Sequence, residues 1–239
     1  MGQIFLVRHG QASFGKDDYD CLSELGHSQA KLLGRWFNSC GLPLERVIAG
    51  GMQRHFQTAK TCVAAWGDTN ALQDDDPLEI DERLNEFDHV DVIDVYRNAA
   101  LETSKEFDEH MVNQSAIPFE EWKRIWGLAM ERWMSSASDA SYKETWSAFR
   151  RRCLDAFDML TDGEHPAKTV AAFTSGGPIA AICQSLLHLD DRATRELIWS
   201  LANTGVTRLL FTKGRRGLGS LNSTAHVDWA RAPNMLTYR

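Results

Sequence analysis

Several features that would assign a chain to a specialised class are missing from this 239-residue sequence. Its five cysteines are an odd number without a C-x-x-C pair, which argues against a disulfide frame or a zinc site and indicates reduced thiols in a cytoplasmic protein. No apolar run approaches the roughly 20 residues that a membrane-spanning helix needs. The net charge of −7 argues against nucleic acid or a membrane as partner, so that an anion site would have to be a local basic pocket.

Targeting, nucleotide-binding and metal-binding signals are also absent. The chain starts directly on an apolar run, and Met1-Gly2 lacks the Ser or Thr that myristoylation requires, so we expect neither a signal peptide nor a lipid anchor. There is no Gly-x-x-x-x-Gly-Lys-Ser/Thr loop for nucleotide phosphates, and the eight histidines show no ligand spacing. We interpret His89, Asp91 and Asp94 as solvent-facing residues. The composition, 43% hydrophobic and 25% charged, is that of a globular protein, and we expect one domain over residues 1–239.

Short apolar runs alternate with helical patterns, which predicts an α/β fold whose mostly parallel central sheet carries helices on both faces. The expected strands are 4–7, 46–49, 78–80, 169–173, 206–211 and 218–221, and the expected helices are 23–40, 53–66, 178–188 and 190–200. Within 88–160 the strand-like runs give way to apolar residues at helical spacing, so this segment is expected to be a helical insertion, its second helix capped near Ser141. We interpret its tryptophan stripe as packing; the alternative is a lid wall that contacts a ligand.

Polar residues follow three of these strands where they end. Arg8 and His9 end the first, Arg54 lies in the first turn of the helix after the second, and Ser175 lies between strand 169–173 and the next helix. Open α/β sheets build their ligand sites at the carboxyl ends of parallel strands. A cation fits poorly with the dipole at a helix N-terminus, so Arg54 is expected to serve a ligand. Its guanidinium and the backbone N–H groups there would form a phosphate receptor.

Together these residues resemble the histidine phosphatase superfamily, the phosphoglycerate mutase-like proteins. The similarity spans nearly the whole chain and rests on Leu6 to Gly10, Asp20, Leu22 to Gly26 followed by Gln29-Ala30, Arg54 with Gln57 to Ala59, and Arg83 to Phe87. It implies a phosphoglycerate mutase-like fold. It also implies a phosphatase that needs no metal or cofactor and hydrolyses a small phosphomonoester.

The resemblance assigns a role to each matching residue. His9 would be the nucleophile and become a phosphohistidine that water hydrolyses, while Arg8 and Arg54 would hold the phosphoryl oxygens. Glu86 would protonate the leaving oxygen. Ser175 and Gly176 would contact the substrate phosphate. Gln11 and Ser13 are further candidates for the pocket.

Two positions depart from the family pattern. Gly51-Met52 stands where relatives usually carry Ser-Pro, and Ser175 stands where they carry a histidine that contacts the phosphoryl group. A serine donates one hydrogen bond but cannot be cationic, so either the activity is slow or another group, for which His226 is a candidate, compensates. The alternatives are a weak or inactive member that binds a phosphorylated ligand or a protein partner and, third, a mutase. The substrate and the oligomeric state stay open.

Overall fold

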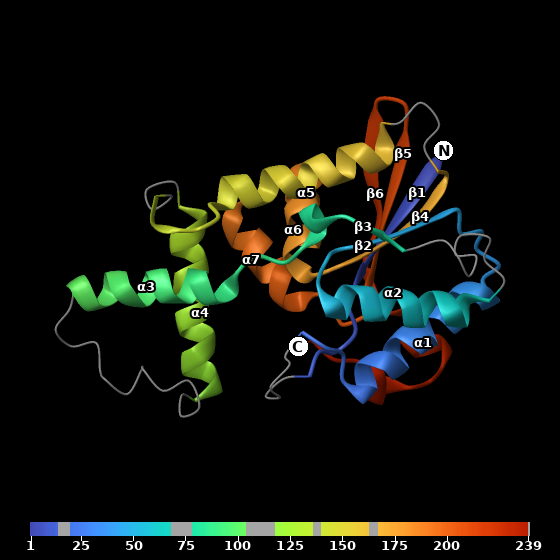
Figure 1. Ribbon diagram of the computed structural model, residues 1–239, viewed down its shortest axis with the longest axis horizontal. Coiled ribbons are helices and arrows are strands. Elements are labelled where there is room, and N and C mark those ends of the chain that lie inside the picture. Colours follow the sequence, from blue (N-terminus) through green and yellow to red (C-terminus); the bar gives the residue numbers. More distant parts are fainter. Residues whose placement is uncertain (14–19, 68–77, 104–117, 136–139, 163–166, 239) are drawn as a thin grey trace.

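The computed structural model describes residues 1–13, 20–67, 78–103, 118–135, 140–162 and 167–238 (Figure 1). Within these residues six strands form one sheet in the order β3-β2-β4-β1-β5-β6. β1, β2, β3 and β4 are parallel, whereas β5 and β6 form an antiparallel hairpin that extends the sheet beyond β1. The predicted mostly parallel sheet is confirmed. The strands are β1 (Gly2–Arg8), β2 (Arg46–Ala49), β3 (Glu79–Ile80), β4 (Thr169–Thr174), β5 (Val206–Thr212) and β6 (Arg215–Ser223).

Helices cover both faces of the sheet, as expected (Figure 1). One face carries α1 (Glu24–Ser39), α2 (Gln53–Trp66) and the short α8 (Ala225–Trp229). The other carries α5 (Trp146–Thr161) and α6 (Gly176–Leu187), with α7 (Asp191–Ser200) beside α6. Beyond them, away from the sheet, lie α3 (His89–Thr103) and α4 (Phe119–Met134). Short 3₁₀ turns are present at η1 (Glu82–Leu84) and η5 (Pro233–Met235). In the described part of the chain, no helix is long and apolar enough to cross a membrane.

The alternation of side chains along β1 explains these two helical layers. Successive strand residues point to opposite faces of a sheet. Ile4 and Leu6 belong to the core on the α5 and α6 side, while Phe5 and Val7 belong to the core under α1 and α2. All four side chains are buried. A strand that is apolar on both faces is stable only when both faces are covered, which is the arrangement observed.

Most predicted helix ends agree with the structure to within two residues, as for α6, which begins at Gly176 where Pro178 was expected, and the start of α5 differs by more. Ser23 caps α1 by accepting a hydrogen bond from the Gly26 N–H, and α2 has the predicted bounds. The predicted cap near Ser141 is wrong, because α5 begins at Trp146 and the Thr145 hydroxyl accepts the Ala148 N–H. The Thr145 hydroxyl directly precedes the apolar stripe of α5, so it can satisfy the first free N–H groups of that helix.

Among the described residues of 88–160 the regular elements are helices, with α3, α4 and most of α5 in this range and no strand; residues 104–117 and 136–139 lie outside the described residues. Its aromatic stripe packs inward. The Phe87 and Trp133 ring centroids are 4.7 Å apart, and Trp133 lies 5.1 Å from Trp146. Both tryptophans are buried, which confirms the packing interpretation for this part of the stripe.

Candidate active site

Three strand ends meet at one edge of the sheet. Arg8 is paired with Thr174 in the β1–β4 register, and Ala49 with Phe173 in the β2–β4 register. The carboxyl ends of β1, β2 and β4 are therefore level. The residues that follow them, which include His9 and Ser175, lie at the same edge, as the sequence predicted.

His9 is buried and its ring orientation is fixed. Its Nδ1 lies 2.7 Å from the Gly10 carbonyl oxygen, which can only accept a hydrogen bond. Nδ1 therefore carries the proton of the neutral ring, and Nε2 keeps its lone pair. Burial, followed by the positive charges of Arg54 and Arg8, holds the pKa of His9 well below its usual value. The ring is thus neutral, with one free nitrogen that can act as a nucleophile.

Two guanidinium groups flank this ring, and each is held by the fold. Arg54, buried in the first turn of α2, donates from Nη1 to the Asp20 carboxylate over 2.7 Å. Arg8 donates to the backbone carbonyl oxygens of Leu201 and Tyr238. Both charges act on the pKa of His9 and of Glu86, so their positive field covers both groups.

Glu86 lies against the start of α6. Its Oε2 accepts the Gly177 N–H over 3.1 Å, and its Oε1 accepts the Phe87 N–H over 3.2 Å. Burial raises the pKa of Glu86 above its usual value, and these N–H groups and the two arginines oppose the rise only in part. A Cβ at Gly177 would lie 2.0 Å from Oε1 of Glu86, so only glycine allows this contact. The site therefore pairs a neutral imidazole with a carboxyl group whose pKa is raised.

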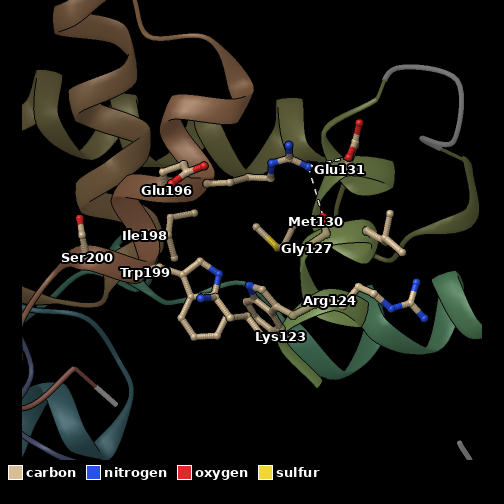
Figure 2. A pocket seen from close by; sticks show the side chains of 12 residues that line it. Lys123, Arg124, Gly127, Met130, Glu131, Glu196, Ile198, Trp199 and Ser200 are labelled. Atoms are coloured by element: carbon tan, nitrogen blue, oxygen red, sulfur yellow. Dashed lines mark hydrogen bonds and ion pairs between the residues drawn. The ribbon is translucent and has the colours of Figure 1, made fainter. Parts of the chain in front are cut away.

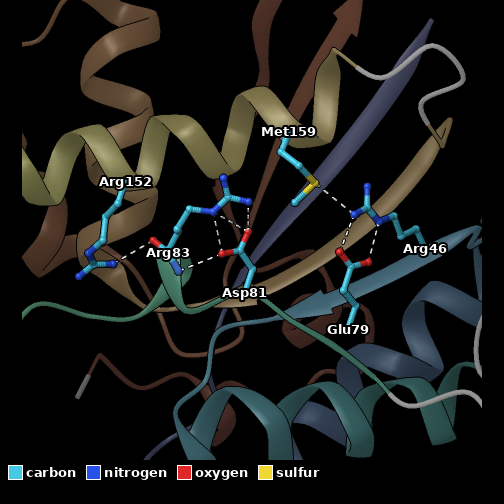
Figure 3. A network of polar contacts seen from close by, with 6 residues as sticks. All are labelled: Arg46, Glu79, Asp81, Arg83, Arg152 and Met159. Atoms are coloured by element: carbon cyan, nitrogen blue, oxygen red, sulfur yellow. Dashed lines mark hydrogen bonds and ion pairs between the residues drawn. The ribbon is translucent and has the colours of Figure 1, made fainter.

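A network of arginines and carboxylates holds the segment that precedes Glu86 (Figure 3). Arg152 of α5 donates from Nη1 to the carbonyl oxygens of Arg83 (2.9 Å) and Asn85 (2.7 Å). Asp81 forms an ion pair with Arg83 over 2.6 Å. Arg152 thus links the backbone that precedes Glu86 to α5, and the Asp81–Arg83 pair holds η1 from within.

Ser175 lies at the N-cap of α6 but does not cap it, because its hydroxyl makes no hydrogen bond to a helix N–H group. Its Oγ lies instead 2.6 Å from Nε2 of His55, and both side chains are fully buried. The His55 and His9 ring centroids are 5.7 Å apart. A second imidazole thus lies beside the candidate nucleophile.

The comparison with known families agrees with this arrangement. The histidine phosphatase superfamily (branch 1) matches residues 4–224, almost the whole chain. The chain belongs to the histidine phosphatase superfamily. The resemblance inferred from the strand-end motifs is confirmed.

Solved structures share the fold of this histidine phosphatase at low identity. Phosphoglycerate mutase from Bacillus anthracis has a TM-score of 0.65 and 17% identity, over 96% of each chain. A phosphoserine phosphatase mutant from Entamoeba histolytica in complex with phosphoserine has a TM-score of 0.60 and 17% identity, over 95% of this chain and all of that one. Mycobacterial glucosyl-3-phosphoglycerate phosphatase in complex with VO₃ has a TM-score of 0.59 and 19% identity, over 94% of this chain and all of that one. No curated protein matches this sequence.

The further candidate residues of this histidine phosphatase have contacts of their own. Gln11 accepts the Ser23 hydroxyl on its side-chain oxygen, and its N–H donates to Gln29. Ser13 is buried, and its N–H donates a hydrogen bond to the Cys21 carbonyl oxygen. His226, the candidate to compensate for Ser175, lies with Nε2 3.0 Å from the Thr204 hydroxyl. Through these contacts Gln11 and His226 stabilise the fold.

His55 is the residue that sequence reasoning missed. Its neighbour Arg54 was singled out for its place in the first turn of α2, and the same place puts His55 at the sheet edge. The contact between His55 and Ser175 joins residues 120 positions apart, and no local pattern signals such a pair.

A cavity of about 630 Å³ opens between α4 and α7 (Figure 2). Its walls combine tryptophan rings with charged side chains, among them Trp126, Trp199 and Lys123. Arg195 also lines the cavity and forms an ion pair with Glu131 over 3.1 Å. The Trp126 ring centroid is 6.0 Å from that of Phe87, the residue after Glu86, so the cavity adjoins the segment that carries Glu86.

Proposed function

We propose that this chain is a metal-independent phosphatase that hydrolyses a small phosphomonoester through a phosphohistidine on His9. One observation carries the proposal. The neutral imidazole of His9 is anchored through Nδ1 to Gly10, and two guanidinium groups lower its pKa. A buried, uncharged imidazole within a positive field suits attack on a phosphate dianion.

In the first half-reaction Nε2 of His9 attacks phosphorus. The N–P bond forms as the bond from phosphorus to the ester oxygen breaks. Arg8 and Arg54 bind the equatorial oxygens and stabilise the charge that develops on them. The raised pKa of Glu86 keeps a larger share of its carboxyl groups protonated, and that proton passes to the departing alcohol.

In the second half-reaction a water molecule attacks the phosphohistidine. Glu86, now a carboxylate, accepts a proton from this water while the N–P bond breaks. Inorganic phosphate leaves, and both His9 and Glu86 regain their starting protonation states. The arginines supply the charge neutralisation that metal ions supply in other phosphoryl-transfer sites.

One observation favours a second function. Ser175 gives the phosphoryl site a neutral hydroxyl, which fits a weak or inactive member that binds a phosphorylated ligand or a protein partner. A mutase ranks third, because it must return the phosphoryl group to a second acceptor and exclude water meanwhile. We infer a small phosphorylated substrate and a cytoplasmic location. The location is supported by five free cysteines, all within the described residues.

A panel of phosphomonoesters tests the proposal. Wild type should release inorganic phosphate from several of them in excess EDTA. His9→Ala should lower the rate by about 1,000-fold or more, because no neighbouring group replaces the nucleophile. The exposed His27 on α1 provides a control, and His27→Ala should keep the wild-type rate. Activity that EDTA abolishes and added metal restores, or turnover by His9→Ala within a few-fold of wild type, would contradict the mechanism.

A further inference from the structure

His55 is a fully buried histidine for which the mechanism above has no use. Its Nε2 lies 2.6 Å from Oγ of Ser175, and that hydroxyl does not cap α6. Burying two polar side chains is costly unless they satisfy each other. The pair is therefore a built unit within the edge of the sheet.

The surroundings of each ring nitrogen favour one position for the proton of this imidazole. Among the described residues, Nδ1 of His55 has no hydrogen-bond partner. It lies against Gly50, where a Cβ would be 2.3 Å from it. Burial and the adjacent Arg54 lower the pKa of His55 well below its usual value, so the ring is neutral. A buried N–H without an acceptor is rarer than a buried ring nitrogen without a donor, so we place the proton on Nε2, which donates to Oγ of Ser175 and leaves the serine O–H for another acceptor.

The surroundings show where that O–H can be used. His55 is next to Arg54, and its ring centroid lies 5.7 Å from that of His9. Ser175 follows Thr174, whose carbonyl oxygen accepts the His9 N–H over 2.8 Å. Two residues further on, Gly177 holds Glu86. The hydroxyl thus lies among the candidate nucleophile, a candidate phosphate clamp and the candidate acid.

We propose that His55 and Ser175 act as one unit, in which His55 positions Ser175 so that its hydroxyl donates a hydrogen bond to the transferring phosphoryl group. His55 is a positioning residue and Ser175 the group that touches the substrate. The inference rests on the proposed function. It explains how the enzyme can still hydrolyse its substrate with a neutral serine at position 175.

A double-mutant cycle tests the unit. Ser175→Ala and His55→Phe should each lower kcat for p-nitrophenyl phosphate by about 10- to 100-fold, the order expected when a donor to the transition state is lost. The double variant should fall no more than about 3-fold below the worse single variant, because the same unit is lost once. His55→Gln keeps an N–H donor near the position of Nε2 and should stay within about 5-fold of wild type.

His226 provides a matched control. It is also a buried histidine whose Nε2 shares a hydrogen bond with a hydroxyl group, that of Thr204, and its Nδ1 has no hydrogen-bond partner among the described residues. His226→Phe should lower the free energy of unfolding as His55→Phe does, yet keep kcat within about 3-fold. Vanadate, which mimics the five-coordinate transition state, adds a second readout. Ser175→Ala and His55→Phe should weaken vanadate inhibition by the factor seen in kcat, and inhibition by inorganic phosphate by less than about 3-fold.

The outcomes separate this inference from the proposed function. If wild type is inactive, or if His9→Ala retains activity, the proposed function itself fails. If wild type works through His9 and Ser175→Ala keeps full kcat and vanadate affinity, only the paired unit is overturned. Losses that multiply in the double variant would also overturn it, because they would mean that the two side chains act independently.

Discussion

At the residue scale, one carbonyl group decides which nitrogen of His9 can react. Gly10 accepts from Nδ1, so the reactive lone pair lies on Nε2. A single hydrogen bond also orients Arg54, because its Nη1 donates to the Asp20 carboxylate. A guanidinium holds its five N–H donors in one rigid plane, so this ion pair orients the whole group.

Arg54 supports a prediction on charge geometry. Arg54→Ala should lower kcat/KM by about 100-fold or more, because a preorganised charged donor is lost. Arg54→Lys should recover only part of this, since a point charge does not reproduce the bidentate fork. Steady-state kinetics with p-nitrophenyl phosphate measures both, with Arg192→Ala on the exposed face of α7 as the control. A lysine variant equal to wild type would mean that Arg54 provides charge alone.

Glu86 supports a prediction on pH. As pH rises through the raised pKa of Glu86, the acid form disappears and the rate should fall. Glu86→Gln should remove this alkaline limb and slow alkyl phosphates more than p-nitrophenyl phosphate, whose leaving group needs little protonation. Glu82→Gln, at an exposed carboxylate on η1, is the control. If the limb persists in Glu86→Gln, another residue is the acid.

At the element scale, the start of α6 and the turn η1 meet around Glu86. The Gly177 N–H reaches the carboxylate only because residue 177 has no side chain. Arg152 fixes the other side of this contact from α5. The position of the proposed acid thus depends on three elements that lie far apart in sequence.

Gly177→Ala tests this dependence. The added Cβ would lie 2.0 Å from Oε1 of Glu86 and 3.0 Å from Cζ of Phe149, so Glu86 must move. Hydrolysis of alkyl phosphates should fall by about 10-fold or more, as for a misplaced general acid. Gly127→Ala in α4 is the control, because nothing lies within 4 Å of its Cβ. This change should stabilise the helix by up to about 1 kcal/mol and leave the rate unchanged. Equal rates for both variants would contradict the role of the contact.

The sequence predicts the elements best where local chemistry decides them. The continuous apolar run of β1, the Ser23 cap and the bounds of α2 all follow from neighbours in the chain. The start of α5 was misplaced because Ser141 and Thr145 both offer a hydroxyl and only packing selects between them. His55 was overlooked because its partner Ser175 comes from another strand end.

At the scale of the whole molecule, an acidic protein contains a compact positive site with neutral histidines. The pKa values of His9 and His55 are well below their usual value, and burial lowers that of His226 to about 4. The unfolded chain binds protons at these positions below about pH 6.5. The free energy of unfolding should therefore decrease as pH falls below this value.

A single substitution isolates the contribution of His55 to this pH dependence of the free energy of unfolding. His55→Gln removes one group that the unfolded chain protonates and the folded chain does not. Between pH 7.5 and 5.5 the free energy of unfolding should fall by up to about 1.4 kcal/mol less in the variant than in wild type. Urea unfolding at the two pH values measures the difference. Parallel pH dependence in wild type and variant would mean that His55 is protonated in the folded protein.

The central claim is that the phosphoryl group passes through His9. The most direct measurement is to quench the enzyme during turnover of p-nitrophenyl phosphate under alkaline conditions and to locate the phosphate by peptide mass spectrometry. The account predicts an acid-labile phosphate on His9, formed in EDTA, absent from His9→Ala and longer-lived in Glu86→Gln. Phosphate on another residue, or sustained turnover with no phosphorylated His9, would contradict it.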